Sequence, residues 1–168
     1  RAALFDSAAG TFYLASDLVD PTPTQEFEVA AEYTRALLHQ HYEIGNRLRS
    51  LDGDERKALD TLMLGDATLT GQEYMSTHVT PQRLVNLPTR GPMPALDAAP
   101  YFIEQRGFFI QAGVNFMSAL SKPGQTSELR LVYSNPPVFT EQLLHIEKYL
   151  AGEAPVEVSL PMLSTVLG

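Results

Sequence analysis

The stretch that decides the fold is V-A-A-E-Y-T-R-A-L-L-H-Q-H-Y-E-I, from Val29 to Ile44. Its apolar residues recur at steps of three and four, which is the spacing of one face of an α-helix. We therefore predict that this stretch is the central helix of the molecule. The helix should begin at residues 22–25, T-P-T-Q, which combine an N-cap, a proline at the first helical position and the glutamine of a capping box. We expect it to end near Ser50.

One stripe of this helix should face the core, and a charged pair should lie beside it. The stripe consists of Phe27, Ala30, Ala31, Thr34, Leu37, Leu38 and His41. Glu32 and Arg35 are three residues apart, so their side chains are neighbours on the helix surface. A charge at the edge of a buried stripe needs either a partner or a side chain long enough to carry its guanidinium to water. By spacing alone, the second arrangement is favoured for Arg35.

Two elements flank this helix in the sequence. Residues 2–15 predict a β-hairpin, because two short β-prone runs surround a turn that ends at Gly10. Asp52, with Glu55 three residues later, predicts the start of a second long helix that reaches Met75 or beyond. Two stripes of this second helix should be buried: Leu59, Leu62, Met63, Asp66 and Leu69 in one, and Thr61, Leu64, Ala67, Thr68 and Gly71 in the other.

The second half of the chain predicts shorter elements. Residues 85–100 are rich in proline and predict a loop, whereas residues 101–120 predict an apolar helix. Gly107 and Gly113 in that helix should let another element approach closely. We expect a short helix over 127–133, a helix over 141–150 capped by Thr140, and a strand over 156–160.

Composition limits the classes of function. The chain has 168 residues, a formal net charge of −8 and no cysteine. This length suits a single domain with a real core, and we expect one domain over 1–168. A nucleic-acid partner is disfavoured, because it needs a basic surface. Without cysteine, thiolate catalysis and cysteine metal sites are excluded.

The ends of the chain and its apolar runs bear on location. No apolar run approaches the roughly 20 residues that a membrane-spanning helix needs, so we expect no membrane span. The chain begins with Arg1 rather than Met. We therefore expect that it lacks its native N-terminus, and the sequence leaves open whether an export signal or an anchor preceded Arg1.

The histidines do not form a metal motif by spacing. His39 and His41 are two residues apart, which places them about 200° apart around a helix, so they cannot share one metal ion. Zinc-binding histidine pairs on helices are usually four residues apart. The simplest reading of each histidine is an ordinary surface residue or a hydrogen-bonded core residue.

Three segments together resemble a family of bacterial, gluzincin-like zinc metallopeptidase domains. The family carries H-E-L-T-H-A-L-Q-D-Q-H-F-D-L, A-L-x-E-G-D-A-T and P-P-x-S-T-E-Q-I-L-H-P-E-K-Y. This chain has A-E-Y-T-R-A-L-L-H-Q-H-Y-E-I from Ala31, T-L-M-L-G-D-A-T from Thr61 and P-P-V-F-T-E-Q-L-L-H-I-E-K-Y from Pro136. The resemblance implies a predominantly helical α+β fold with a small N-terminal hairpin or sheet packed on the active-site helix.

The resemblance also implies that the zinc ligands are lost. The family's H-E-x-x-H corresponds here to Ala31-Glu32-Tyr33-Thr34-Arg35. Its two ligand histidines therefore correspond to Ala31 and Arg35, and its glutamate ligand corresponds to Leu64. The general base corresponds to Glu32, which is kept. Methyl and isobutyl groups cannot bind a metal, and a guanidinium repels one, so we expect no zinc, no other cofactor and no zinc catalysis.

Other motif positions have weaker implications. We expect Arg35 to lie at the vacated metal position and to pair with Glu32, and Leu64 to fill part of the former site. Asp66 matches a residue that once oriented a ligand, and we expect it to bond Tyr33 or Arg35. Tyr133 and His145 match positions kept in the family, either as remnants of an oxyanion-stabilising group or as parts of a structural helix.

Two functions follow from these observations. The first is a catalytically inactive peptidase-like domain that binds a peptide or another protein in the old cleft, where an edge strand is open to strand addition. The alternative is a hydrolase or peptidase that uses a rearranged metal site or metal-free acid–base chemistry around Glu32, with His39, His41, His145 and Asp66. The resemblance implies a location outside the cytoplasm, since family members often carry export signals.

Overall fold

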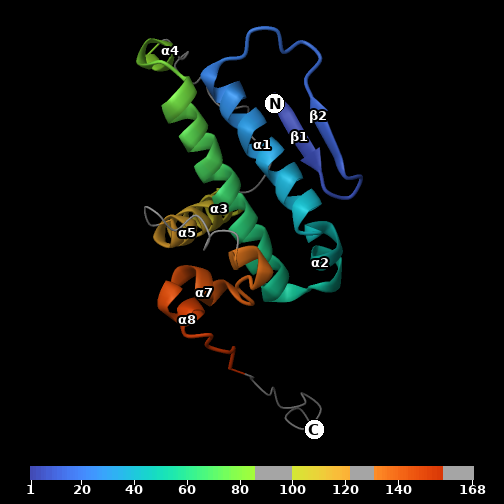
Figure 1. Cartoon of the computed structure of the whole chain (residues 1–168), viewed down its shortest axis with the longest axis vertical. Helices are drawn as coiled ribbons and strands as arrows, with labels where there is room; N and C mark the ends of the chain where they lie inside the picture. Colours follow the sequence, from blue (N-terminus) through green and yellow to red (C-terminus); the bar gives the residue numbers. More distant parts are fainter. Residues whose placement is uncertain (86–99, 122–130, 157–168) are drawn as a thin grey trace.

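The structure is a computed structural model that describes residues 1–85, 100–121 and 131–156. Two long helices, α1 (Pro23–His41) and α3 (Gly53–His78), lie side by side (Figure 1). The hairpin of β1 (Ala3–Asp6) and β2 (Thr11–Leu14) packs on α1, and α5 (Pro100–Leu120) packs on α3. The prediction of a predominantly helical chain with a small N-terminal hairpin is confirmed.

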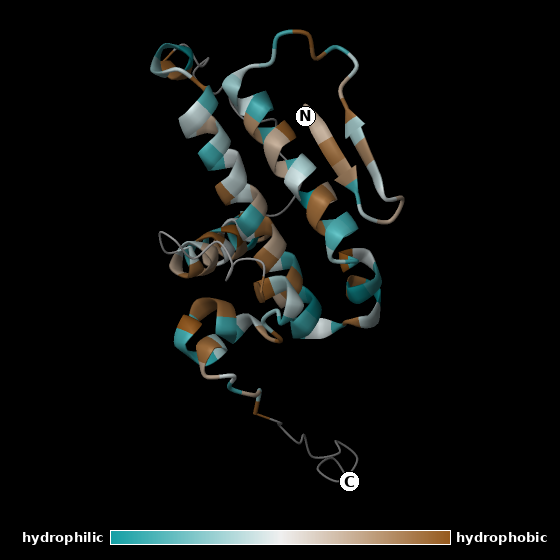
Figure 2. Cartoon of the chain, viewed as in Figure 1, coloured by the Kyte–Doolittle hydropathy of each residue, from teal (hydrophilic) through white to brown (hydrophobic). Residues whose placement is uncertain are grey.

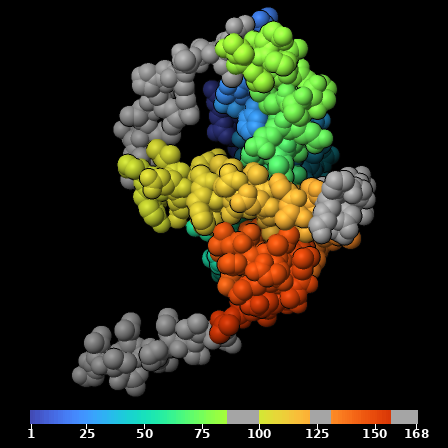
Figure 3. Space-filling model, turned by 90° about the vertical axis from the view of Figure 1, so that its left-hand side faces the viewer, coloured from blue at the N-terminus to red at the C-terminus, as the bar shows by residue number. Residues whose placement is uncertain are grey.

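Shorter helices complete the described chain: α2 (Ile44–Ser50), α4 (Pro81–Val85), α7 (Thr140–Leu144) and α8 (Ile146–Leu150). Figure 3 shows α5 as a band across the molecule, with α7 and α8 on one side of it and α3 on the other. Within the described ranges, none of the helices has the length and apolar character needed to span a bilayer.

The hairpin forms as predicted, with antiparallel pairs from Ala3–Leu14 to Asp6–Thr11. Gly10 ends the turn with φ +62°, a left-handed conformation that suits glycine. In Figure 2, β1 is coloured hydrophobic over most of its length and lies against α1. The hairpin therefore covers the face of α1 that is turned away from α3.

The start of α1 is confirmed, but its predicted end is wrong. The Thr22 hydroxyl accepts from the Gln25 N–H, and the Thr22 N–H donates to the Gln25 side chain at 2.8 Å, which completes the capping box. The helix ends at His41 instead of near Ser50, because Glu43 adopts a left-handed conformation with φ 52°. A residue in that conformation cannot continue a right-handed helix, and the chain resumes as the separate helix α2.

The central helix is α3, and the prediction of a central helix at residues 29–44 is wrong. The middle of α3 is buried on several sides, because α1, α5 and α7 all pack on it. In α1, by contrast, the predicted buried stripe is partly open, and Leu37 and His41 are exposed. The main core joins α2, α3, α5, residues 132–133 and α7 through Ile44, Ala58, Leu59, Leu62, Met63, Phe116, Met117, Leu120, Val132, Tyr133 and Leu143.

The close packing predicted at Gly113 is confirmed, and that at Gly107 is wrong. A Cβ added at Gly113 would overlap the carbonyl of Thr61, and one added at Gly65 would overlap the backbone of Gly113. Helices α3 and α5 thus meet backbone to backbone. Gly107 has no other atom within 4 Å of such a Cβ, because it lies on an open part of α5.

Several predictions for the C-terminal part need correction. Thr140 is not a helix cap: Phe139 is the cap residue of α7, and the Thr140 N–H and hydroxyl donate to Asp54 at 2.7 and 2.8 Å. The helix predicted over 141–150 is broken at His145 into α7 and α8. Asp52 is the cap residue of α3 as predicted, but its side chain makes no capping bond.

Other predictions fall partly outside the described residues. Leu131–Ser134 is helical, whereas the rest of the short helix predicted over 127–133 lies outside the described ranges. Residues 86–99 of the predicted loop and residues 157–160 of the predicted strand also lie outside the described ranges. The ends of that loop, Val85 and Pro100, belong to α4 and α5.

The backbone contact between α3 and α5 predicts unequal effects of alanine at two glycines. Gly65→Ala should lower the free energy of unfolding by about 1–3 kcal/mol, because its Cβ meets backbone that cannot move aside. Gly107→Ala is the matched control. It should raise the free energy of unfolding by about 0.5–1 kcal/mol, because alanine has a higher helix propensity than glycine and its Cβ meets no described atom there. Urea unfolding followed by circular dichroism measures both. Equal effects would contradict the backbone contact.

Candidate functional site

The four positions singled out by the motif comparison come together. Ala31, Glu32, Arg35 and Leu64 line one hollow of about 530 Å³ between β1, α1, α3 and α5. We call this hollow the cleft; its lining also includes Arg1, Ala3, Phe27, Glu28, Ala67, Thr68, Arg106 and Ile110. Leu64 and Arg35 therefore line the same hollow, and its identity as a former metal site stays a prediction.

Glu32 is held by several donors at once. Its Oε1 accepts from Arg1 Nη2 at 2.9 Å, and its Oε2 accepts from the Phe5 N–H at 3.0 Å. Arg35 Nη1 donates to both oxygens, at 3.0 Å to Oε2 and 3.3 Å to Oε1. Only 13% of the Glu32 side chain is exposed. The carboxylate thus fastens the hairpin to α1, and both of its oxygens are engaged.

The outer edge of β1 is occupied as well. Besides the Phe5 N–H, the Ala3 carbonyl accepts from Arg1 Nε at 3.1 Å. Next to the strand, the Ala2 N–H donates to Glu28 Oε2 at 2.8 Å. Strand addition requires free N–H and C=O groups along an edge. At β1, the Phe5 N–H and the Ala3 carbonyl are already bonded to side chains, so a peptide would have to displace Glu32 and Arg1 from these two groups.

Arg35 lies in the cleft with its charge paired. The predicted pairing with Glu32 is confirmed, and the arrangement favoured by spacing alone, with the guanidinium carried out to water, is wrong because only 19% of the side chain is exposed. Nη1 makes both of the hydrogen bonds to Glu32. The buried Nε has no partner among the described residues.

The cleft does not fit a zinc ion. Ala31 and Leu64 offer no donor atom, and Arg35 contributes a permanent positive charge at the position of the second histidine. Both carboxylates of the lining are already engaged, Glu32 by two guanidinium groups and a backbone N–H, and Glu28 by the Ala2 N–H. A divalent cation in this place would lie next to a guanidinium without compensating ligands.

Asp66 and Tyr133 form a pair outside the cleft. Tyr133 Oη donates to Asp66 Oδ2 at 2.8 Å, so the expected bonds from Tyr33 or Arg35 to Asp66 are wrong. Burial raises the pKa of Asp66, and the hydrogen bond from Tyr133 offsets part of that rise. Burial, with Asp66 close by, also raises the pKa of Tyr133, whose ring stacks on Tyr42 at 4.6 Å. This pair supports the core and lines no part of the cleft.

The histidines are dispersed. His145 separates α7 from α8, with 53% of its side chain exposed and Nδ1 3.5 Å from Glu147. His39 packs edge-on against Phe5, and burial, followed by the charges of Arg49 and Arg35, lowers the pKa of its imidazole. Across residues 1–85, 100–121 and 131–156, no three His, Cys, Asp or Glu side chains gather as a possible metal site.

Sequence reasoning missed Arg106 and Ile110, which bring α5 to the cleft. A signal for both was present. They precede Gly113 by seven and three residues, which places all three on one face of a helix. Once Gly113 is taken as the closest approach to a neighbouring helix, the two side chains must lie on the side of α5 turned toward α3.

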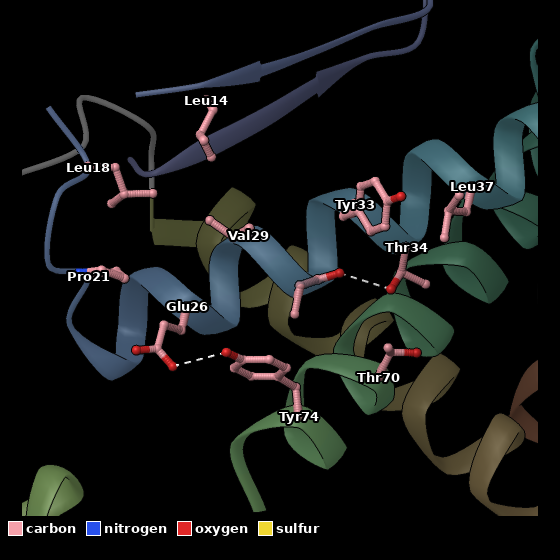
Figure 4. Close-up of a pocket in the computed structure, with 11 residues that line it drawn as sticks. Leu14, Leu18, Pro21, Glu26, Val29, Tyr33, Thr34, Leu37, Thr70 and Tyr74 are labelled. Carbon is pink, nitrogen blue, oxygen red and sulfur yellow. Dashed lines mark hydrogen bonds between the residues drawn. The ribbon is translucent and has the colours of Figure 1, made fainter. Parts of the chain in front are cut away.

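A second hollow of about 500 Å³ lies on the other side of α1. We call it the apolar hollow; it is lined by residues from β2, the following loop, α1 and α3, among them Leu14, Leu18, Val29, Tyr33, Leu37 and Tyr74. Figure 4 shows the Glu26 carboxylate and the Tyr74 hydroxyl meeting at one end, at 3.3 Å. Glu26 also pairs with Arg83 at 2.5 Å, so its charge is compensated.

Comparisons with protein-family models, curated proteins and solved structures found no match to this chain. The resemblance to zinc peptidases therefore stays a prediction that rests on the sequence motifs alone.

Glu32→Gln tests the role of this carboxylate as a fastener. Glutamine keeps the shape but loses the charge that pairs Arg1 and Arg35, so the free energy of unfolding should fall by about 1–3 kcal/mol. The Phe5 amide should also exchange its hydrogen faster. Urea unfolding and amide exchange by NMR measure the two effects. Glu141→Gln, which removes an exposed pair with Lys148, should change neither; an effect as large as that of Glu32→Gln would refute the assigned role.

The raised pKa of Asp66 predicts a pH-dependent cost. Because the folded pKa lies above the ordinary value of 3.8, the ionised carboxylate destabilises the folded state at neutral pH. That cost disappears as the pH falls through the raised pKa toward 3.8. Asp66→Asn cannot ionise, so its stability relative to the natural protein should improve as the pH rises from 4 to 7. Urea unfolding at several pH values measures this difference, and a difference independent of pH would contradict the prediction.

Proposed function

We propose that this chain is a catalytically inactive domain of the gluzincin-like zinc peptidase fold, and that its cleft binds a ligand, a segment of peptide or protein. The observation that carries the proposal is the ion pair of Arg35 and Glu32, at 3.0 Å, in a hollow that Ala31 and Leu64 also line. Each of these residues stands where the motif comparison expects a part of the catalytic site.

The inactivity follows from two requirements of zinc peptidases. The metal must acidify a bound water, and the general base must accept the proton of that water. Ala31, Arg35 and Leu64 offer the metal no ligand atom, and Glu32 has its two oxygens bonded to Arg1, Arg35 and the Phe5 N–H. A carboxylate in this state serves to fasten the hairpin and is poorly placed to take up a proton.

The ligand-binding part of the proposal rests on the space that remains. A hollow of about 530 Å³ lies within the range of about 300–1,000 Å³ usual for ligand sites. Its lining combines apolar side chains with arginine and glutamate, a mixture that suits a peptide side chain or chain end. Because the β1 edge is occupied, recognition should use the side chains of the cleft and not strand addition.

Restoring the ligands tests the proposal. The triple variant Ala31→His, Arg35→His, Leu64→Glu should bind one Zn²⁺ per chain after dialysis, because three donors would then face one hollow. The natural protein should retain none. Metal analysis of the dialysed proteins and zinc titration by calorimetry measure this.

Two controls sharpen the experiment. The double variant Ala31→His, Arg35→His lacks the third ligand and should bind zinc more weakly than the triple variant. A peptide-cleavage assay of the natural protein, with and without added Zn²⁺, should show no turnover. Stoichiometric zinc in the natural protein, or zinc-dependent cleavage by it, would refute the proposed inactivity.

A further inference from the structure

We infer that the ligand of the cleft is a carboxylate that carries an apolar group. This inference rests on the proposed function, because it names the chemistry that the same cleft would recognise. Three observations lead to it: the balance of charge in the cleft, the hydrogen-bond donors that its arginines leave unused among the described residues, and the apolar surface beside them.

The charge balance of the cleft differs from that of the whole chain. Arg1, Arg35 and Arg106 line it together with only two acids, Glu28 and Glu32, so three positive charges face two negative ones. The chain as a whole has a net charge of −8. A local excess of one positive charge in an acidic protein attracts an anion to this place and disfavours a cation.

Arg106 supplies the excess charge. It projects from α5, is exposed, and makes no ion pair or hydrogen bond with any described residue. The two glutamates of the cleft are engaged elsewhere, Glu28 by the Ala2 N–H and Glu32 by Arg1, Arg35 and the Phe5 N–H. Among the described residues, no acceptor takes up the donors of the planar Arg106 guanidinium, whose fork matches the two oxygens of a carboxylate.

Arg35 adds donors from the opposite side. Its Nη1 makes both bonds to Glu32, and its Nη2 donates to no described residue. The ion pair holds this side chain in place, which lowers the entropic cost of binding an anion beside it. Arginines from α1 and α5 thus line one space, and the second acid of its lining, Glu28, bonds the Ala2 N–H and neither of these arginines among the described residues.

The remaining lining is apolar. Ala31, Leu64, Ala67, Phe27 and Ile110 contribute hydrocarbon surface to the same hollow. An inorganic anion would leave this apolar surface exposed to water, whereas the aliphatic group of an organic carboxylate would bury it. The C-terminus of a peptide with an apolar last residue has this chemistry, and so has a small free carboxylic acid.

Isothermal titration of the zinc-free protein with three probes tests the inference. N-acetyl-leucyl-leucine carries a free carboxylate, its C-terminal amide lacks the charge, and 4-methylpentanoate is a free acid with the same aliphatic group. The acid form of the dipeptide should bind at least about tenfold more tightly than the amide, because it makes charge-assisted hydrogen bonds to arginine. Its binding should weaken as the salt concentration rises.

The two carboxylate probes distinguish the source of the ligand. Tighter binding of the dipeptide than of 4-methylpentanoate identifies a peptide C-terminus, and equal binding identifies a small free acid. Both results support a carboxylate with an apolar group.

Variants locate the site. Arg106→Ala should weaken binding of the acid at least about tenfold without altering its circular dichroism, and Arg106→Lys should have an intermediate effect. Arg56→Ala, which removes an exposed arginine of α3 outside the cleft, should leave the affinity unchanged.

Equal affinities for acid and amide, no loss in Arg106→Ala, or no binding of either carboxylate would each overturn the inference. These outcomes leave the proposed inactivity untouched, because that proposal fails only if the natural protein binds zinc or cleaves peptides.

Discussion

The backbone contact between α3 and α5 is the constraint on which the rest of the structure depends. Gly65 and Gly113 bring the two helices so close that a methyl group at either glycine would overlap main-chain atoms. This approach seals the core around Phe116 and Met117. It also sets the direction of α5, which carries Arg106 and Ile110 to the cleft beside α1. The positions of Arg106 and Ile110 beside the cleft therefore depend on the two glycines, Gly65 and Gly113.

Glu32 joins the elements on the other side of the cleft. In a zinc peptidase, the corresponding carboxylate acts on a water that the metal has activated. Here two guanidinium groups and a strand N–H surround it, so the charge that a metal site would provide comes from arginine. If the proposed descent from a zinc peptidase is right, the pair with Arg35 gives this acid a new partner in place of the metal site. The position of Glu32 in this structure has an explanation that requires no turnover.

Much of the fold was predictable because its signals are local. The capping box at Thr22 and the turn at Gly10 each act through neighbouring residues, and the structure confirms them. The close approach indicated by Gly113 is confirmed, but its partner Gly65 is distant in the sequence. The break at Glu43 was missed. The role of Asp54 as partner of Thr140 was missed because the two residues are 86 positions apart. In the site, helix spacing made Arg35 and Glu32 neighbours but favoured a guanidinium in water, and the expectation that they pair came from the resemblance. Asp66 was assigned the wrong partner, because Tyr133 lies 67 residues away in the sequence and periodicity says nothing about such contacts.

The occupied edge of β1 has a consequence for behaviour at high concentration. A two-stranded sheet exposes two rows of unpaired backbone groups, and such edges invite pairing between copies of a chain. On β1, Glu32 accepts from the Phe5 N–H and Arg1 donates to the Ala3 carbonyl, which withdraws part of one row from intermolecular contact. β2 is only four residues long, and short edge strands pair poorly. The carboxylate that fastens the hairpin therefore also protects the protein from edge-to-edge aggregation.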